Sequence, residues 1–358
     1  MPERGADAGY GVDAACLPDD APAVVRLWGE ALGRVEKRQQ KLQWFYAHPG
    51  RERARLFVLR HTGEIVGATG IGPRSLWWRG SSVDAALMGD FAVASRHRTL
   101  YPAMLLQRST LQQGLQEYAL LYGFPNARSL PVVRRVGYQV LPGMARYARM
   151  LRSSFYLPSF WPAALRRAGG ALLDRLLGLR HALALMLPRR GLHTAWLHEP
   201  DARFDALWLR LREQVGDCVI GVRDCALLRW RFPSHTARQP RFFVLSDRQG
   251  ERLLGYAVCQ PNAQASALQI LDLLVDAPSP ACVARLLRLL AETARAQGYR
   301  SLSVQCGGPD WLLAGVRAAG LVPRQSTQRE PMILALAPGM PQEMATVGWY
   351  LSYADTDE

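Results

Sequence analysis

The sequence has almost no lysine, no pattern of paired cysteines and no long apolar run. Only Lys37 and Lys41 are lysines among 44 lysine and arginine residues. The six cysteines are scattered without a Cys-x-x-Cys pair or a histidine cluster, which argues against a disulfide framework and a zinc site. No opening segment has the features of a secretory signal, and no apolar run approaches the about 20 residues that span a bilayer. We therefore expect a cytoplasmic protein with reduced thiols and no bound metal.

The composition is that of a globular protein with an excess of positive charge. The chain has 358 residues, of which 49% are hydrophobic and 21% are charged, enough for two ordinary domains. The net charge of +14 comes almost wholly from arginine, whose content also follows genome composition. The excess is weak evidence for nucleic acid, but it favours an anionic partner such as a phosphate-bearing cofactor, an acidic sugar or a membrane surface.

Two parts of the chain share the same order of short sequence words. Each has a helix with an aromatic end, a Phe-Val-Leu strand, a hairpin about a glycine, an apolar strand with an aspartate, and a long helix. The first copy carries LQWFY, FVL and Asp90, and the second carries LRWRF, FVL and Asp272. This repetition predicts a tandem duplication: an N-terminal domain over 1–150, a linker over 151–192, a degenerate C-terminal domain over 193–340 and a tail over 341–358.

A basic turn interrupts the first copy where its apolar strand gives way to a helix. The stretch SRHRTLYPAMLLQR begins at Ser95 and places Arg96 and Arg98 beside the expected helix start. Free backbone N–H groups and positive charge at one spot suit a phosphate group. The second copy has no arginine in the corresponding turn before its helix ACVARLLRLLAETARA, so we expect that half to shape the site rather than to bind a phosphate.

The order of elements resembles the Gcn5-related N-acetyltransferase (GNAT) superfamily. The strand-turn-helix takes the place of the superfamily's pyrophosphate loop, and NARSLPVVRRVGY takes the place of its second motif. The words GDFAVASRHRTLYPAMLLQRS, LYGFPNARSLPVVRRVGY and WYLSYADTD are similar to those of tandem-domain bacterial proteins associated with exopolysaccharide and exosortase genes. The resemblance implies an α+β fold of two layered domains, each a mixed central sheet flanked by helices.

The resemblance also implies an activity. We expect the N-terminal half to move an acetyl or other acyl group from acyl-CoA to an amine on a sugar or other precursor of cell-surface polysaccharide, by direct attack and without a metal. Two alternatives stay open: a non-catalytic acyl-CoA-binding or scaffolding protein, and a tRNA-dependent aminoacyl transferase. The tRNA-dependent transferase ranks last of the three readings, because it needs a contiguous basic face and the sequence makes a nucleic-acid partner a poor expectation.

The donor site is expected at the end of the first aspartate-bearing strand and in the basic turn. Backbone amides there could polarise the thioester carbonyl, and the turn could hold the pyrophosphate. Thr99 and Tyr101 stand where the superfamily loop has small residues, which alters the loop geometry. The expected donor-binding residues are Phe91, Ala92, Val93, Arg96, Arg98, Thr99, Leu100, Tyr101 and Asn126.

Asp90 is the candidate general base, because a carboxylate inside an apolar strand should have a raised pKa. A structural carboxylate is the equal alternative, and the matching Asp272 favours it. Val133 takes the place of the superfamily's tyrosine that acts as general acid. Tyr122 is therefore the candidate general acid for the leaving thiolate, and Tyr101 or water are the alternatives. Asn126 serves either the donor or the start of a helix.

The segment 155–191 is rich in leucine and arginine. It predicts an amphipathic helix that either packs between the domains or makes peripheral contact with a membrane surface.

Overall fold

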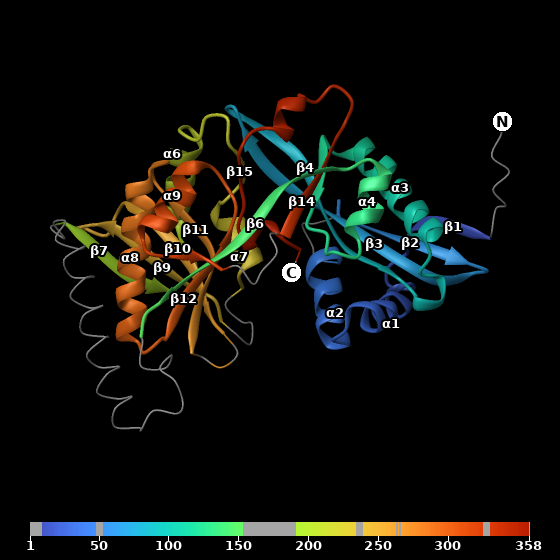
Figure 1. The fold of residues 1–358 in the computed structure, drawn as a ribbon, viewed down its shortest axis with the longest axis horizontal. Coiled ribbons are helices and arrows are strands. Elements are labelled where there is room, and N and C mark those ends of the chain that lie inside the picture. The colour runs from blue at the N-terminus through green and yellow to red at the C-terminus, as the bar shows by residue number, and fades with distance from the viewer. Residues whose placement is uncertain are drawn as a thin grey trace.

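The computed structural model describes residues 9–47, 53–152, 191–233, 239–262, 264, 266–324 and 330–357 (Figure 1). The predicted amphipathic segment 155–191 therefore lies outside the described residues, apart from its last position.

The first half of the chain alternates helices with strands of one sheet. In chain order its elements are β1 (Tyr10–Ala14), α1 (Ala21–Leu32), α2 (Val35–Lys41), a π-helical turn (Leu42–Tyr46), β2 (Arg55–His61), β3 (Glu64–Trp78), β4 (Ser81–Val93), α3 (Leu100–Glu117), β5 (Leu120–Gly123), α4 (Leu130–Val136) and β6 (Gln139–Met150). Figure 1 shows α1 and α2 on one face of this sheet and α3 and α4 on the other.

The second half has nearly the same order of elements. They are β7 (Leu192–Leu197), α6 (Ala202–Arg212), β8 (Val219–Gly221), α7 (Cys225–Arg231), β9 (Arg241–Asp247), β10 (Leu253–Pro261), β11 (Ala267–Val275), α8 (Pro280–Ala296), β12 (Ser301–Cys306), α9 (Asp310–Ala318), β13 (Val322–Pro323), β14 (Glu330–Leu336) and β15 (Trp349–Tyr350). The helices form where apolar residues recur every three or four positions, as in α8, which buries Val283, Leu286, Leu287 and Leu290.

One sheet runs through both halves, with its main path in the order β1-β2-β3-β4-β5-β14-β6-β12-β11-β10-β9-β7. Most neighbours are antiparallel, whereas β4 pairs with β5 and β11 pairs with β12 in parallel. The predicted mixed α/β architecture, with helices covering the sheet, is confirmed.

The two halves exchange strands at the centre of this sheet. The late strand β14 lies between β5 and β6, so the end of the chain completes the first half. Strand β6 pairs with β14 near Val140 and with β12 near Tyr147, so it also completes the second half. Gly143 permits the crossing, because a Cβ there would lie 1.7 Å from the carbonyl oxygen of Glu330. The halves are thus joined by backbone pairing as well as by side chains.

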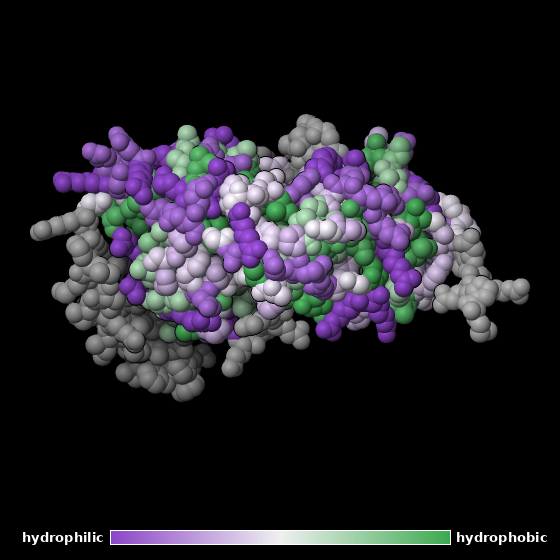
Figure 2. All heavy atoms as spheres, turned by 90° about the horizontal axis from the view of Figure 1, so that it is seen from above, coloured by the Kyte–Doolittle hydropathy of each residue, from purple (hydrophilic) through white to green (hydrophobic). Residues whose placement is uncertain are grey.

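Within the described residues, no helix is long and apolar enough to cross a membrane. Hydrophilic residues are interspersed with smaller hydrophobic areas on the face shown in Figure 2.

Candidate functional site

The first half opens between β4 and β5. Their parallel pairing covers Ala85–Met88 and Leu120–Gly123, whereas β4 continues to Val93. Among the described residues, β4 has no strand partner on its β5 side beyond the last pair, and its outward N–H groups there are open to partners other than a strand. The same arrangement recurs between β11 and β12 in the second half.

A β-bulge lies at the start of the unpaired part of β4. Gly70 pairs with Gly89 and Ala68 with Ala92, so the single residue Thr69 faces both Asp90 and Phe91. Asp90 has a φ of 55°, a left-handed conformation that is costly for a residue other than glycine. The indole N–H of Trp28 donates to the Asp90 carbonyl over 3.0 Å and helps to hold this backbone. The bulge turns the peptide groups of β4 at the point where the strands separate.

The basic turn follows the bulge and leads into α3. Nη2 of Arg98 donates a hydrogen bond to the carbonyl oxygen of Val93 over 3.1 Å. This contact binds the turn to the last residue of β4. Arg96 pairs with Glu64, and both side chains are about two-thirds exposed. Thr99 occupies the N-cap position of α3 without a side-chain hydrogen bond, so no side chain caps the first turn of this helix. The N–H groups of Leu100 and Tyr101 precede the first complete turn and carry the positive end of the helix dipole.

The corresponding helix of the second half begins differently. The hydroxyl of Ser279 accepts a hydrogen bond from the N–H of Ala281, so α8 is capped by its own chain. The turn between β11 and α8 contains no arginine. The start of α3 is therefore the better place for an anion.

The Asp90 side chain points away from the turn into a buried group of polar residues. It is 1% exposed, and Oδ1 lies 2.7 Å from Nζ of Lys41 and 3.5 Å from Nη1 of Arg38. Oδ2 accepts a hydrogen bond from the Tyr46 hydroxyl over 2.9 Å. Burial raises the pKa of Asp90 above its ordinary value, more than the Lys41 ammonium lowers it. The carboxyl is held in one orientation by partners from α2 and the π-helical turn.

The end of the chain reaches the same place. Oδ2 of Asp357 lies 2.8 Å from Nζ of Lys41, and the backbone N–H of Asp90 also donates to this carboxylate. Gly89 makes room for it, because a Cβ there would lie 2.4 Å from Asp357 Oδ2. Burial opposes ionisation of Asp357, but the Lys41 ammonium and the amide outweigh it and hold its pKa below the usual range. Two carboxylates therefore share one ammonium at the bulge.

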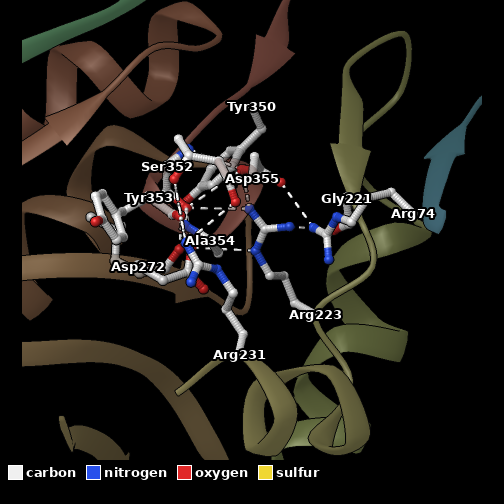
Figure 3. Close-up of polar contacts among 12 residues, drawn as sticks. Arg74, Gly221, Arg223, Arg231, Asp272, Tyr350, Ser352, Tyr353, Ala354 and Asp355 are labelled. Carbon is white, nitrogen blue, oxygen red and sulfur yellow. Dashed lines mark hydrogen bonds and ion pairs between the residues drawn. The ribbon is translucent and has the colours of Figure 1, made fainter. Parts of the chain in front are cut away.

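A second buried network fixes the tail between the two halves (Figure 3). Asp355 is bound by Arg74 of β3, over 3.1 Å, and by Arg223 of the second half, over 2.5 Å. Arg223 also contacts Asp272, whose carboxylate accepts from the hydroxyl of Ser352 over 2.6 Å. All five side chains are almost completely buried. Asp272 is thus held by partners within the chain. Through Ser352 the tail contacts β11 beside its β-bulge opposite β10.

Residues 16–141 match the family model of the acetyltransferase (GNAT) domain. The splayed parallel strands, the bulge and the open helix start all lie within this match. The fold is that of the GNAT acyl-CoA N-acyltransferases.

Solved structures with this GNAT fold align over most of the chain. A GCN5-related N-acetyltransferase from Anabaena variabilis is 13% identical, with a TM-score of 0.64 over 91% of this chain and 72% of that one. A probable N-acyltransferase from Enterococcus faecalis is 13% identical, with a TM-score of 0.65 over the same shares. Saccharomyces cerevisiae N-myristoyltransferase with bound myristoyl-CoA is 12% identical, with a TM-score of 0.54 over 95% of this chain and 88% of that one. No curated protein sequence matches the chain.

Most predicted donor-binding residues lie together in this GNAT-fold half. Phe91, Ala92 and Val93 form the end of β4, and the remaining turn residues follow them directly: Arg96, Arg98, Thr99, Leu100 and Tyr101. Leu100 is 44% exposed and Tyr101 is 51% exposed, unusually high values for large hydrophobic residues. His97, in the same turn, shares a 2.7 Å hydrogen bond with the Tyr10 hydroxyl.

Asn126 and Tyr122 already have partners within the chain. The Asn126 side-chain oxygen accepts from the N–H groups of Arg128 and Ser129, which precede α4, and its residue remains exposed. The Tyr122 hydroxyl is buried and donates to the Asp355 carbonyl over 3.3 Å. Burial raises the pKa of Tyr122, so this hydroxyl keeps its proton at neutral pH. Their roles in catalysis stay predictions.

Sequence reasoning missed Lys41 and Asp357. The signals were a lysine in an arginine-rich chain and the acidic residues Asp355, Asp357 and Glu358 in the ending WYLSYADTDE.

Proposed function

We propose that the N-terminal half transfers an acyl group from acyl-CoA to an amine. The observation that carries this proposal is the uncapped start of α3, flanked by Arg96 and Arg98, next to the bulge where β4 separates from β5. This arrangement offers N–H groups and positive charge for a pyrophosphate and unpaired strand backbone for an extended chain with amide groups. The acceptor we propose is an amine on a sugar or other precursor of cell-surface polysaccharide, which rests on the sequence words alone.

Each part of this site has a separate task. Arg96 and Arg98 bind the donor phosphates together with the N–H groups that open α3. Backbone N–H groups between Phe91 and Val93 orient the thioester carbonyl and stabilise negative charge on its oxygen. Asp90 receives the proton that the amine must lose before it attacks. The chain therefore supplies binding, orientation and proton transfer, and the acyl group moves by direct attack.

Tyr122 and Asn126 complete the proposed site. Tyr122 would supply a proton to the departing sulfur after its hydroxyl turns from the carbonyl of Asp355. Asn126 follows β5, and its amide nitrogen remains available to a ligand while the oxygen begins α4. Both side chains also make hydrogen bonds within the chain, so we expect their substitution to lower stability as well as transfer.

A thiol-release assay with acetyl-CoA, myristoyl-CoA and a panel of amino sugars tests the proposal. We expect release that depends on an amine and that falls at least about tenfold in an Arg96→Ala/Arg98→Ala variant, because each lost charged phosphate contact costs about 1.5–3 kcal/mol. Arg108→Ala, which removes an exposed arginine farther along α3, is the matched control. Donor binding without release from any acceptor would instead support a binding protein and contradict the proposed activity.

A further inference from the structure

Lys41 is the buried lysine of the chain, and it lies between two carboxylates. Its Nζ is 2.7 Å from Asp90 Oδ1 and 2.8 Å from Asp357 Oδ2, and its side chain is 9% exposed. The other lysine, Lys37, is exposed on the same helix. In the part of the chain that the structure describes, the other buried aspartates, Asp20, Asp272 and Asp355, are each paired with arginine. The protein uses lysine at one buried position although arginine serves at the others.

Lysine and arginine differ in one property that matters here. A guanidinium stays protonated under all conditions that a folded protein meets, whereas a buried ammonium can give up a proton and take another. Arginine would also bridge two carboxylates well, because its planar fork matches their geometry. A lysine at this position therefore suits a place where protons move.

The three groups form a line from partial exposure to complete burial. The exposed fraction of the side chain falls from 18% at Asp357 to 9% at Lys41 and 1% at Asp90. Asp357 also accepts the backbone N–H of Asp90, so this line begins beside the bulge. Lys41 therefore links the carboxylate of Asp357 to that of Asp90.

We propose that Lys41 relays protons between Asp357 and Asp90 during acyl transfer, an inference that rests on the proposed function. Asp357 takes a proton from the incoming ammonium group; it passes a proton to Lys41 as Lys41 passes one to Asp90. The freed amine lone pair forms the bond to the acyl carbon, the carbon–sulfur bond breaks, and sulfur leaves with that electron pair. Tyr122 gives its proton to the sulfur and takes the second amine proton in return, and the proton stored on Asp90 returns to solvent by the same route.

Burial lowers the pKa of Lys41, but the two carboxylates outweigh it and raise that pKa above its ordinary value, so Lys41 must receive a proton as it gives one. Tyr46 donates to Asp90 Oδ2, which leaves Oδ1 facing Lys41, and Arg38 lies 3.5 Å from that oxygen. The charge of Arg231 also acts on Asp357 from the second half. Burial raises the pKa of Asp90, while that of Asp357 is lowered, so a proton that enters the group settles on Asp90.

Substitution of Lys41 distinguishes a relay from an ion pair. Lys41→Arg keeps the charge and removes proton exchange, Lys41→Met removes both, and Lys37→Arg is the control. We expect Lys41→Arg to bind acyl-CoA like the wild type and to lose about 100-fold or more in kcat, the usual range for lost acid–base catalysis. A Lys41→Arg enzyme with kcat within about threefold of the wild type would overturn the relay.

A spectroscopic test needs no substituted lysine. Protein labelled with 15N at lysine Nζ has only two such signals, and Lys37 is the internal reference. We expect the Lys41 signal to change with pH over the range in which transfer changes, and this step to disappear in Asp90→Asn. If the 15N signal of Lys41 changes neither with pH nor in Asp90→Asn, the relay is rejected, even where Lys41→Arg does not fold. If the Lys41 signal shows a pH step that depends on Asp90 but the protein transfers no acyl group, the proposed function is rejected, and with it the role of the relay in transfer.

Discussion

Trp44 and Trp230 stack on one another, with ring centroids 4.6 Å apart and planes inclined by 14°. The indole N–H of Trp44 also donates to the Trp230 carbonyl over 3.0 Å. The two residues occupy the same place in the repeated words LQWFY and LRWRF. The stack therefore joins the two halves at matching places of the repeated words.

This stack should stabilise the junction measurably. A double-mutant cycle of Trp44→Ala and Trp230→Ala is expected to give a coupling free energy of about 0.5–1.5 kcal/mol, because stacked aromatic rings gain that much beyond burial. Denaturant unfolding of the four proteins measures it. Trp44→Ala combined with Trp311→Ala, whose ring instead contacts Tyr350, is expected to be additive. Additivity in the first pair would mean that the stack contributes nothing.

Under the proposed function, Glu64 competes with the acyl-CoA donor for Arg96. Its carboxylate pairs with the guanidinium at the exposed turn, so Glu64→Gln is expected to raise acyl-CoA affinity a few-fold at low salt. High salt should reduce the gain, since both groups face solvent. Asp84→Asn removes an equally exposed ion pair from β4, that with Arg53, and should leave affinity unchanged. An equal effect of both substitutions would point to net charge rather than to the turn.

Asp355 should couple stability to acid pH. Burial opposes its ionisation, but Arg223 and Arg74 outweigh that effect and hold its pKa below the usual value. Its stabilising contribution is therefore complete above about pH 4 and is lost as the pH falls toward the lower pKa of the folded state. Thermal melting between neutral and strongly acid pH should show this loss in the wild type.

Asp355→Asn should remove that acid dependence, leave the buried guanidinium of Arg74 without its paired carboxylate, and leave Arg223 paired with Asp272 but not with the tail. We expect a loss of about 3–5 kcal/mol in the free energy of unfolding. Asp217→Asn, which breaks the exposed pair with Arg79, should cost less than about 1 kcal/mol. Similar losses in both variants would contradict the central role of the tail.

Gly89 should be required for the tail to reach the bulge. Gly89→Ala would place its Cβ 2.4 Å from Asp357 Oδ2, so the carboxylate must move away from Lys41. We expect a loss of about 1–3 kcal/mol in stability and a lower transfer rate. Gly11→Ala in β1, where a Cβ meets nothing within 4 Å, is the control. Unchanged stability and transfer in Gly89→Ala would show that the Asp357 contact is dispensable.

Much of the fold follows from local sequence patterns. Apolar periodicity predicts the amphipathic helices and the sheet, and the repeated words around Trp44 and Trp230 predict two similar halves. The position of Asp90 in an apolar strand correctly implies a buried carboxyl with a raised pKa. The assigned domain boundaries stay a prediction.

Other features depend on contacts between distant parts of the chain. The insertion of β14 between β5 and β6 joins Ile333 to Gly123, and no local pattern specifies such a partner. The contact between Lys41 and Asp357 spans nearly the whole sequence and depends on that exchange of strands. The left-handed backbone of Asp90 is likewise set by the bulge and by Trp28, not by any preference of aspartate alone.

Calorimetric titration with acetyl-CoA and myristoyl-CoA tests the central claim most directly, because it asks whether the β4–α3 turn binds a donor. We predict one acyl-CoA per chain, since α3 is open and α8 is capped by Ser279. Binding should weaken by about tenfold or more in Arg96→Ala/Arg98→Ala and persist in Arg108→Ala. The absence of binding to either donor, or binding that the double variant retains in full, would contradict the account.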